Sequence, residues 1–305
     1  FKYYLIVNMS IEVNTLPNIN TVIKHKKKAL PASNHTHLPP FYFIYTSIAQ
    51  KNSGKTYSVC NFIKLYEEHG IKSGLGEDMP IRTIWCSPTS NFSTNSIIYT
   101  LKSLDEDDVY DQVTEGTLID IFEKIKAEKE LIKKKDAYIS AYKRFIKIKD
   151  PSILKIEDIL ILGEYNFEDY REVFGNLKDY MYFWVLDDVI GSVDSVISSK
   201  KNNFLNNLAI KSRHYQVNLI IISQKLTYLP PIIRNQVDIL QLFPSASSKV
   251  LESYYDEVSN SLTWDEFLQL FAFATKEKYS SLIINNHPNA PHRFLSNWNK
   301  SLSIN

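Results

Sequence analysis

Residues 49–56 read A-Q-K-N-S-G-K-T and place a lysine and a hydroxyl directly after a glycine. They fit the phosphate-binding loop pattern except at the first position, where Ala49 replaces a glycine. In this pattern backbone N–H groups surround the phosphates, the lysine reaches the β- and γ-oxygens and the hydroxyl binds Mg²⁺. The alternative is a chance G-K-T in a surface turn. We predict a nucleotide site with Mg²⁺ bound by Thr56, whose binding residues are Ala49, Gln50, Lys51, Asn52, Ser53, Gly54, Lys55, Thr56 and Tyr57.

Two carboxylates, Asp187 and Asp188, directly follow the apolar run 183–186. A carboxylate at the end of a buried strand beside the loop strand can hold the magnesium that Thr56 binds from its other side. We therefore predict Asp187 as a second metal ligand and Asp188 as the general base that activates water. The alternative is that two acids merely end a strand.

Two further residues could take part in hydrolysis. Gln224 follows the apolar run 217–223 and could hydrogen-bond the γ-phosphate or the attacking water. Arg213 precedes the same run. Its planar guanidinium group could stabilise transition-state charge in a neighbouring subunit better than a lysine would. A solvated strand-end amide and a plain surface arginine are the respective alternatives.

The elements that must position these residues follow from hydrophobic patterning. Apolar, strand-length runs alternate with segments of helical period, which predicts an α/β fold with a mostly parallel central sheet and helices on both faces. The predicted strands begin at Phe41 and then cover 81–87, 181–186, 217–223, 237–243 and 279–285. The predicted helices cover 55–68, 93–104, 203–214, 248–256 and 264–275, with a helical insertion at about 105–178. We expect residues 1–40 to be an N-terminal extension and residues 41–305 to be one domain.

Composition narrows the classes of protein. The 305 residues are 44% hydrophobic and 23% charged, which indicates a folded chain, and two cysteines are too few for a disulfide framework. No apolar run is long enough to span a membrane. A net charge of +1 gives no global reason to expect nucleic acid, so any such contact must be local. Candidates are Lys200 with Lys201, and the 117–150 segment with ten basic and six acidic residues, which is otherwise a solvated helix.

The order of these motifs resembles a known family. The loop, then F-W-V-L-D-D, then L-A-I-K-S-R-H-Y-Q-V-N-L-I-I-I-S-Q, then L-P-P-I-I-R-N-Q is similar to the FtsK-HerA superfamily of DNA-translocating ATPases. Within it, the sequence most resembles genome-packaging ATPases of nucleocytoplasmic large DNA viruses and virophages. The S-P-T at 87–89 and the L-P-x-x-I-R at 229–234 carry this closer likeness.

The resemblance implies a RecA-like (ASCE) P-loop domain that uses ATP and Mg²⁺. It implies that Asp187 and Asp188 are the acidic pair, Gln224 the glutamine sensor and Arg213 the arginine supplied to the neighbouring site, with Arg234 in reserve. It also implies a homo-oligomeric ring, expected to be a hexamer, that threads double-stranded DNA and contacts capsid or portal-vertex proteins in a host cytoplasmic viral factory or the virion. Ala49 and Asp188 depart from the family pattern, and Asp188 stands where cellular members usually have glutamate.

Two other functions use the same loop. A nucleotide or small-molecule kinase would need an acceptor pocket and an arginine-rich lid, which six arginines make hard to assemble. A non-hydrolysing nucleotide-binding interaction protein would keep the loop as a relic.

Overall fold

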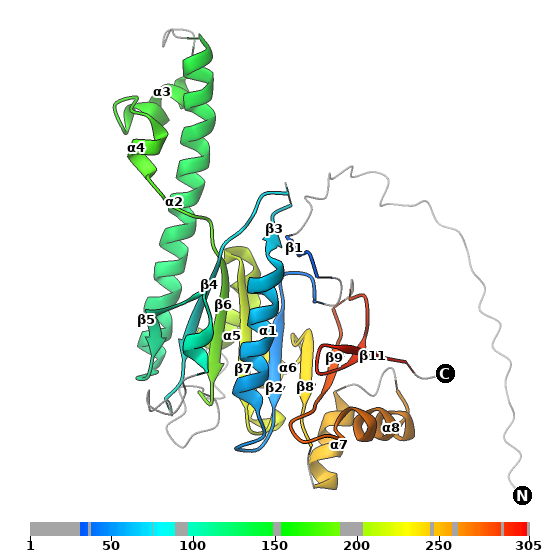
Figure 1. Ribbon diagram of the computed structural model, residues 1–305. Coiled ribbons are helices and arrows are strands. Elements are labelled where there is room, and N and C mark those ends of the chain that lie inside the picture. Colours follow the sequence, from blue (N-terminus) through cyan, green and yellow to red (C-terminus); the bar gives the residue numbers. More distant parts are fainter. Residues whose placement is uncertain are drawn as a thin grey trace, which may run out of the picture.

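The protein is built around a nine-stranded sheet (Figure 1). The computed structural model describes residues 31–35, 38–74, 76–88, 97–148, 154–189, 204–244, 247–257, 262–287 and 290–303. The strand order is β11-β10-β9-β8-β2-β7-β6-β4-β5. Its strands are β2 (Ile44–Ile48), β4 (Ile81–Cys86), β5 (Leu104–Tyr110), β6 (Met181–Asp187), β7 (Val217–Ser223), β8 (Ile239–Leu242), β9 (Leu282–Asn285), β10 (Phe294–Ser296) and β11 (Lys300–Leu302).

The sheet is parallel from β5 through β8 and antiparallel from β8 to β11. Every residue of β2, β6 and β7 is buried, because these central strands are covered on both faces. A small separate pair joins β1 (Ala32–Ser33) to β3 (Ile71–Lys72). The predicted mostly parallel α/β sheet is confirmed, and the loop strand lies within it with a strand on either side, as a RecA-like fold requires.

Helices cover both faces of the sheet, as predicted (Figure 1). On one face α1 (Lys55–His69) packs Val59, Phe62 and Tyr66 against aromatic strand residues such as Phe183. The other face is covered by the buried half of α2 (Glu115–Ile148) and by three further helices. These are α5 (Phe204–Lys211), α7 (Ser248–Asp256) and α8 (Trp264–Ala274).

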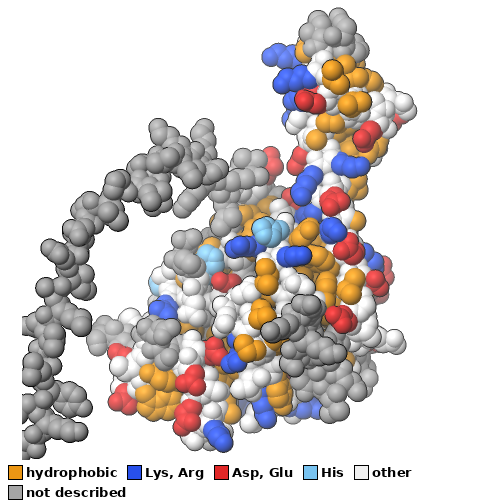
Figure 2. Space-filling view, turned by 180° about the vertical axis from the view of Figure 1, so that it is seen from behind, with side chains coloured by type: hydrophobic (Ala, Val, Ile, Leu, Met, Phe, Trp, Pro, Cys, Tyr) orange, Lys and Arg blue, Asp and Glu red, His pale blue; other side chains and the backbone are white. Residues whose placement is uncertain are grey.

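A helical arm, defined as α2, α3 (Ile156–Gly163) and α4 (Tyr170–Phe174), extends beyond the sheet (Figure 1). At 34 residues α2 is about 50 Å long. The far end of the arm has its own small core around Tyr138, Leu162 and Phe174. Figure 2 shows hydrophobic side chains on the arm surface, and Ile156 is 76% exposed.

The predicted insertion at about 105–178 contains a strand that the sequence did not reveal. Its first residues form β5, an edge strand parallel to β4, rather than the start of a helix. Three of its four acids, Asp105, Glu106 and Asp107, face solvent, whereas Asp108 is buried against Arg82. An edge strand can carry such charges because one side of it faces water.

Other predicted boundaries shift. In the predicted helical insertion, one long helix, α2, covers 115–148, and the strand predicted from Tyr279 begins at Leu282. The helix predicted at 93–104 is wrong over its described part, 97–104, which contains only a short 3₁₀ turn, η2 (Ile98–Thr100), and ends where β5 begins at Leu104. Residues 93–96 lie outside the described residues. The N-terminal extension through residue 30 also lies outside them. Within the described ranges, no helix has both the length and the apolar character to cross a membrane.

Candidate nucleotide site at the phosphate-binding loop

The loop connects β2 to α1, and two of its residues have left-handed backbone conformations. Asn52 has φ 64° and Gly54 has φ 91°. A Cβ at Gly54 would be strained by that φ and would lie 3.3 Å from Cδ1 of Tyr279, so this position requires glycine. The Ser53 hydroxyl donates to the Gln50 carbonyl at 2.7 Å, and the Ser58 N–H donates to the Gly54 carbonyl at 2.9 Å. Hydrogen bonds within the protein therefore hold the loop in a turn.

Lys55 is buried, with 7% of its surface exposed, at the first position of α1. Its Nζ donates to the Ala49 carbonyl at 2.7 Å and to the Gln50 carbonyl at 3.4 Å. Burial lowers the pKa of this ammonium, while the charges of Asp188 and Asp187 oppose that shift. The cation is held by loop carbonyls, and an anion reaching the loop would give it a charged partner.

Thr56 and Asp187 lie together although 131 residues separate them. The Thr56 hydroxyl donates to Oδ2 of Asp187 at 3.3 Å. Asp187 is 5% exposed, and burial together with the charge of Asp188 raises the pKa of its carboxyl to about 7, against the opposing effects of Lys55 and Thr56. The Asp187 carboxyl is incompletely neutralised by nearby cations and lies beside the Thr56 hydroxyl. Together the two groups offer two oxygen ligands of the kind that Mg²⁺ prefers.

Magnesium fits this pair only as part of a nucleotide complex. Among the described residues, no group of three or more histidine, cysteine, aspartate or glutamate side chains could hold a metal ion. Mg²⁺ is commonly bound through one or two protein oxygens plus substrate phosphates and water. Thr56 and Asp187 therefore fit the predicted metal ligands when phosphate oxygens complete the coordination.

The strand that carries the acids does not neighbour the loop strand, contrary to the sequence prediction. β2 pairs with β7 and β8, whereas β6 pairs with β7 and β4, so β7 lies between the two. The site still forms because Thr56, in the first turn of α1, reaches Asp187 across the end of β7. Patterning identifies buried strands but contains no information on their order in the sheet.

Asp188 lies beside the site and is half-buried. Its φ is 51°, an uncommon conformation for a residue other than glycine, and its N–H donates to the Ile222 carbonyl at 3.1 Å. Its charge raises the pKa values of both Asp187 and Lys55. The structure thus brings Asp188 to the loop, and its assignment as general base stays a prediction.

Gln224 and Arg213 lie at opposite ends of β7. Gln224 is exposed directly after β7, at the edge that holds the loop, and the Ala49 N–H donates to the neighbouring Ser223 carbonyl at 3.1 Å. Arg213 is exposed in the turn η4 (Ser212–Tyr215) before β7, so a seven-residue strand, about 20 Å, separates it from the loop of its own chain. The structure therefore does not bring Arg213 to this site.

The remaining candidates lie elsewhere. Arg234, at the end of α6 (Pro231–Arg234), pairs with Glu257 at 2.7 Å within its own chain. Lys200 and Lys201 lie outside the described residues.

Tyr279 is a site residue that sequence reasoning missed. It precedes β9 with φ 67° and is 54% exposed, and its ring lies against Gly54. It stands 225 positions after Gly54 in a stretch that patterning assigns to a strand, so no local signal could have linked the two.

Comparison with known proteins gives only distant structural likeness. No family model matches the sequence, and no curated protein matches it. The structure is similar to the genome packaging NTPase B204 of Sulfolobus turreted icosahedral virus 2, solved with AMPPCP, at 16% identity and TM-score 0.42, covering 86% of this chain and 98% of that one.

Two further structures show similarly distant likeness. The pCW3 conjugation coupling protein TcpA with ATPγS has 12% identity and TM-score 0.38, covering 92% of this chain and 68% of that one. EssC from Geobacillus thermodenitrificans, ATPases 2 and 3, has 13% identity and TM-score 0.42, covering 93% and 47% respectively. The site is therefore interpreted from its own geometry: a phosphate loop, a buried lysine and a hydroxyl–carboxylate pair on an α/β sheet.

Proposed function

We propose that this protein is an ATPase that translocates double-stranded DNA, and that it packages a viral genome into a preformed capsid. Two independent observations support this. The sequence resembles FtsK-HerA translocases along residues 41–285, apart from the insertion. The geometry of the loop and of the two acids at the end of β6 has the parts needed to bind and hydrolyse a nucleoside triphosphate.

The contact between Thr56 and Asp187 carries the proposal. It unites the two halves of a hydrolytic P-loop site from segments 131 residues apart. A chance G-K-T turn has no reason to place its hydroxyl against a buried carboxylate whose pKa is raised to about 7. Perturbed carboxyls next to a phosphate loop are typical of functional sites.

Each residue has a defined task in the proposed reaction. The loop amides and Lys55 hold the triphosphate, and Thr56 and Asp187 hold the magnesium that screens its charge. Asp188 accepts a proton from the attacking water, and Gln224, at the end of β7, contacts the γ-phosphate or that water.

The role proposed for Arg213 requires a ring rather than a monomer. Because it lies at the opposite edge of the sheet from the loop, it can stabilise transition-state charge only in a neighbouring subunit. We therefore propose a homo-oligomeric ring, with a hexamer as the expected size. Capsid or portal-vertex partners and location in a viral factory or virion are part of the same proposal.

Turnover assays separate this function from its rivals. We expect Mg²⁺-dependent ATP hydrolysis that rises with long double-stranded DNA and displacement of a third strand from a triplex by the moving motor. Hydrolysis that responds to a small acceptor instead of DNA would favour a kinase. Nucleotide binding without turnover in either case would contradict the proposal and favour a binding protein.

Mixed rings test Arg213 directly. Arg213→Ala should abolish turnover while leaving ATP binding intact. Adding Lys55→Ala subunits, which retain Arg213 but have no working loop, should restore part of the activity. If Arg213→Ala leaves turnover unchanged, or if mixing restores nothing, the assignment to the neighbouring site is wrong.

A further inference from the structure

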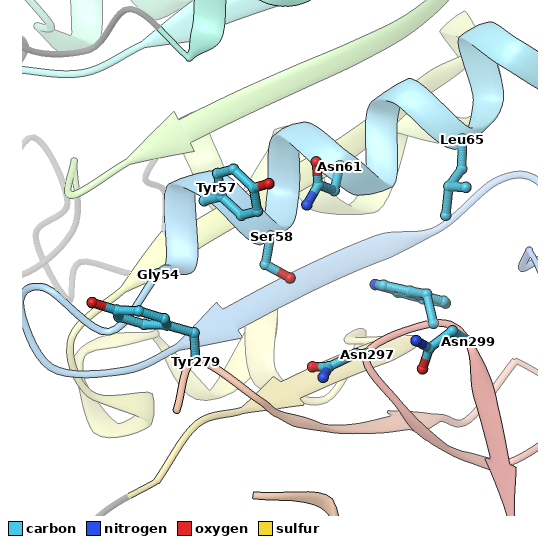
Figure 3. Close-up of a pocket in the computed structure, with 9 residues that line it drawn as sticks. Gly54, Tyr57, Ser58, Asn61, Leu65, Tyr279, Asn297 and Asn299 are labelled. Carbon is cyan, nitrogen blue, oxygen red and sulfur yellow. The ribbon is translucent and has the colours of Figure 1, made fainter. Parts of the chain in front are cut away.

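A cavity of about 710 Å³ opens beside the phosphate loop, between α1 and the C-terminal segment (Figure 3). Gly54 lies at its loop end, and Tyr57, Ser58 and Asn61 contribute to the wall formed by α1. Tyr279 and the β10–β11 turn form the facing wall. A ligand held by the loop would therefore have this space directly next to it.

The cavity lies on the side of the loop away from the acids. In the sheet, β7 and β6 follow β2 on one side, and Asp187 ends β6. β8, β9 and β10 follow β2 on the other side, and the cavity lies over this side. Phosphates bound at the loop could thus have Thr56 and Asp187 on one side and the cavity on the other.

None of the described residues that line the cavity carries a charge at neutral pH. Phosphate sites use arginine, lysine or clustered backbone amides, so the lining does not suit a further phosphate group. Two tyrosines and three asparagines line it instead, which suits an uncharged aromatic group with polar edges.

The two tyrosines face the space with much of their surface uncovered. Tyr57 is 58% exposed on α1 and Tyr279 is 54% exposed on the opposite wall, both near Gly54 (Figure 3). Nucleobases stack readily on exposed aromatic side chains, and such stacking tolerates different bases because each has a π-face. The base of a nucleotide bound at the loop could stack on these two tyrosines, near Gly54.

Several residues of the wall that faces α1 have strained backbone conformations. The described residues include eight non-glycine positions with positive φ, and three of them, Tyr279, Asn297 and Trp298, line this cavity. Such conformations persist only where surrounding packing holds them, and they are concentrated at ligand sites. Trp298 is held by its ring contacts with Phe62 at 4.6 Å and Tyr45 at 5.9 Å, so packing within the protein fixes this wall.

The asparagine side-chain amides offer polar contacts to a ligand in the cavity without selecting one particular base. Oδ1 of Asn297 accepts from the N–H of Ser281 at 2.9 Å and from its hydroxyl at 3.1 Å, which leaves the Asn297 amide N–H groups as donors. Asn61 and Asn299 are exposed and carry both donor and acceptor groups. Exposed amides can rotate to suit different base edges.

We propose that this cavity binds the base and ribose of a purine nucleoside triphosphate, with Tyr279 as the stacking residue that determines affinity for the base. The proposal rests on the proposed nucleotide function and adds how the nucleoside is recognised. Because recognition comes from stacking and adaptable amides, the protein should accept ATP and GTP with affinities within about tenfold of each other.

Binding of two probes tests the proposal. Dissociation constants are measured for ATP, which has a base, and for inorganic tripolyphosphate, which has none. Tyr279→Ala should weaken ATP binding by roughly tenfold and leave tripolyphosphate binding unchanged. Tyr279→Phe keeps the aromatic face and should bind both probes as the unaltered protein does. Phe273→Ala removes a 64% exposed aromatic residue outside the cavity and serves as the matched control.

A cavity-filling variant tests the same point from the opposite direction. Asn61 is exposed on α1, so Asn61→Trp should fold normally and fill the space. It should block ATP but not tripolyphosphate. If Tyr279→Ala weakens both probes equally, Tyr279 acts only through the Gly54 turn and the proposal is wrong; unchanged ATP binding in Tyr279→Ala and Asn61→Trp would also overturn it. The translocase function fails separately, when ATP binds and is not hydrolysed.

Discussion

Lys55 and Lys129 are equally buried, each with 7% of its surface exposed, yet the two sites differ in how they neutralise the charge. Lys129, on α2, donates to Oδ1 of Asp179 at 2.5 Å, to the Tyr180 carbonyl and to Oε1 of Gln216. Lys55 donates to two loop carbonyls, and within the described ranges it forms no ion pair. Burial lowers the pKa of both ammonium groups, and at Lys129 the hydrogen bond that its ammonium donates to Asp179 opposes the shift.

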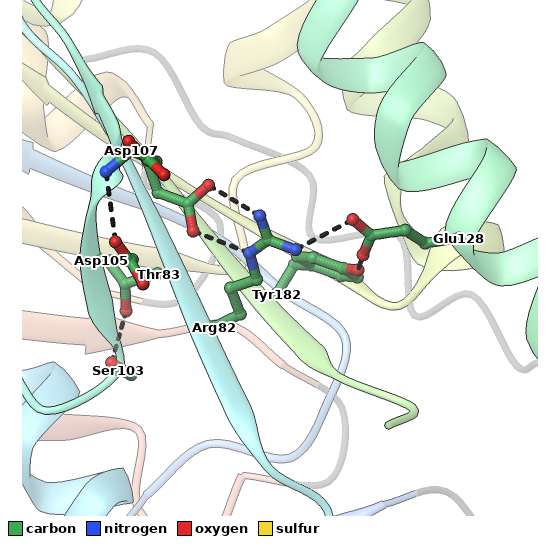
Figure 4. A network of polar contacts seen from close by, with 8 residues as sticks. Arg82, Thr83, Ser103, Asp105, Asp107, Glu128 and Tyr182 are labelled. Atoms are coloured by element: carbon green, nitrogen blue, oxygen red, sulfur yellow. Dashed lines mark hydrogen bonds and ion pairs between the residues drawn. The ribbon is translucent and has the colours of Figure 1, made fainter. Parts of the chain in front are cut away.

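The contrast extends to the two regions around these lysines. At the base of the arm Arg82 forms a two-pronged pair with Asp108, at 2.7 and 2.9 Å, and a third bond to Glu128 at 2.9 Å (Figure 4). Glu128 also accepts from the hydroxyl of Tyr182. This region fastens α2 to the sheet with its charges paired, whereas the loop region keeps a buried cation and a buried carboxyl only partly neutralised. Incomplete pairing of buried charges lowers the stability of the fold, but it is useful where a charged ligand must bind.

The largest effect should come from Lys55→Ala, because in the proposed function it removes the cation that would contact the transferring phosphate. We expect turnover to fall by about a thousandfold or more, ~4 kcal/mol of transition-state stabilisation, with little change in unfolding by urea. Steady-state ATP hydrolysis and circular dichroism measure the two. Lys64→Ala, on the same helix, is the control and should keep full activity. Unfolding of Lys55→Ala would show that this lysine is structural, as Lys129 is.

Asp187→Asn should separate stability from activity as pH changes. The Asp187 carboxyl titrates at about 7 when folded and near 3.8 when unfolded, so the native state binds the proton more tightly and loses stability as pH rises through 7. The substitution should abolish turnover and raise the free energy of unfolding at pH 8 by up to roughly 4 kcal/mol, in the absence of nucleotide. That gain should vanish near pH 4. An equal gain at both pH values would mean that ionisation of Asp187 is not its source.

Lys129→Met should act on stability rather than on the loop. It leaves Asp179 without its cationic partner and with only the Gln216 amide as a donor among the described residues, and because Asp179 is 39% exposed we expect a loss of about 2–3 kcal/mol in the free energy of unfolding. ATP binding at low temperature should be unchanged. The matched control is Lys126→Met, which breaks an exposed pair with Glu123 on the same helix and should leave the free energy of unfolding nearly unchanged. Equal losses in the two variants would contradict the distinction.

Glu128→Gln should give the smallest effect, because Arg82 keeps both bonds to Asp108 when its third partner becomes neutral. We expect a loss of about 1 kcal/mol in the free energy of unfolding, measured by urea denaturation. Turnover should not change. A loss of activity instead would mean that the arm base communicates with the loop.

Some of the fold and the site could be predicted from local sequence. The strand at 217–223 and the helix beginning at Lys55 match observed elements closely, since a buried strand and an amphipathic helix each leave a periodic pattern. The acidic strand β5 could not be predicted, because its only buried acid is stabilised by Arg82, a residue distant in sequence. The same holds for the turn at Asn297 and Trp298, where packing against Phe62 outweighs the preference of such turns for glycine.

The sequence by itself determined which residues could hold a phosphate, a metal and a water molecule, because the loop pattern and the acids after an apolar run are local features. Only the tertiary structure decided that β7 separates the acid strand from the loop strand, that Thr56 nevertheless reaches Asp187, and that Tyr279 lies on Gly54. It also placed Arg213 at the far edge of the sheet. Strand order and contacts between distant segments follow from how whole faces pack together, and that packing leaves no signature within any short stretch of chain.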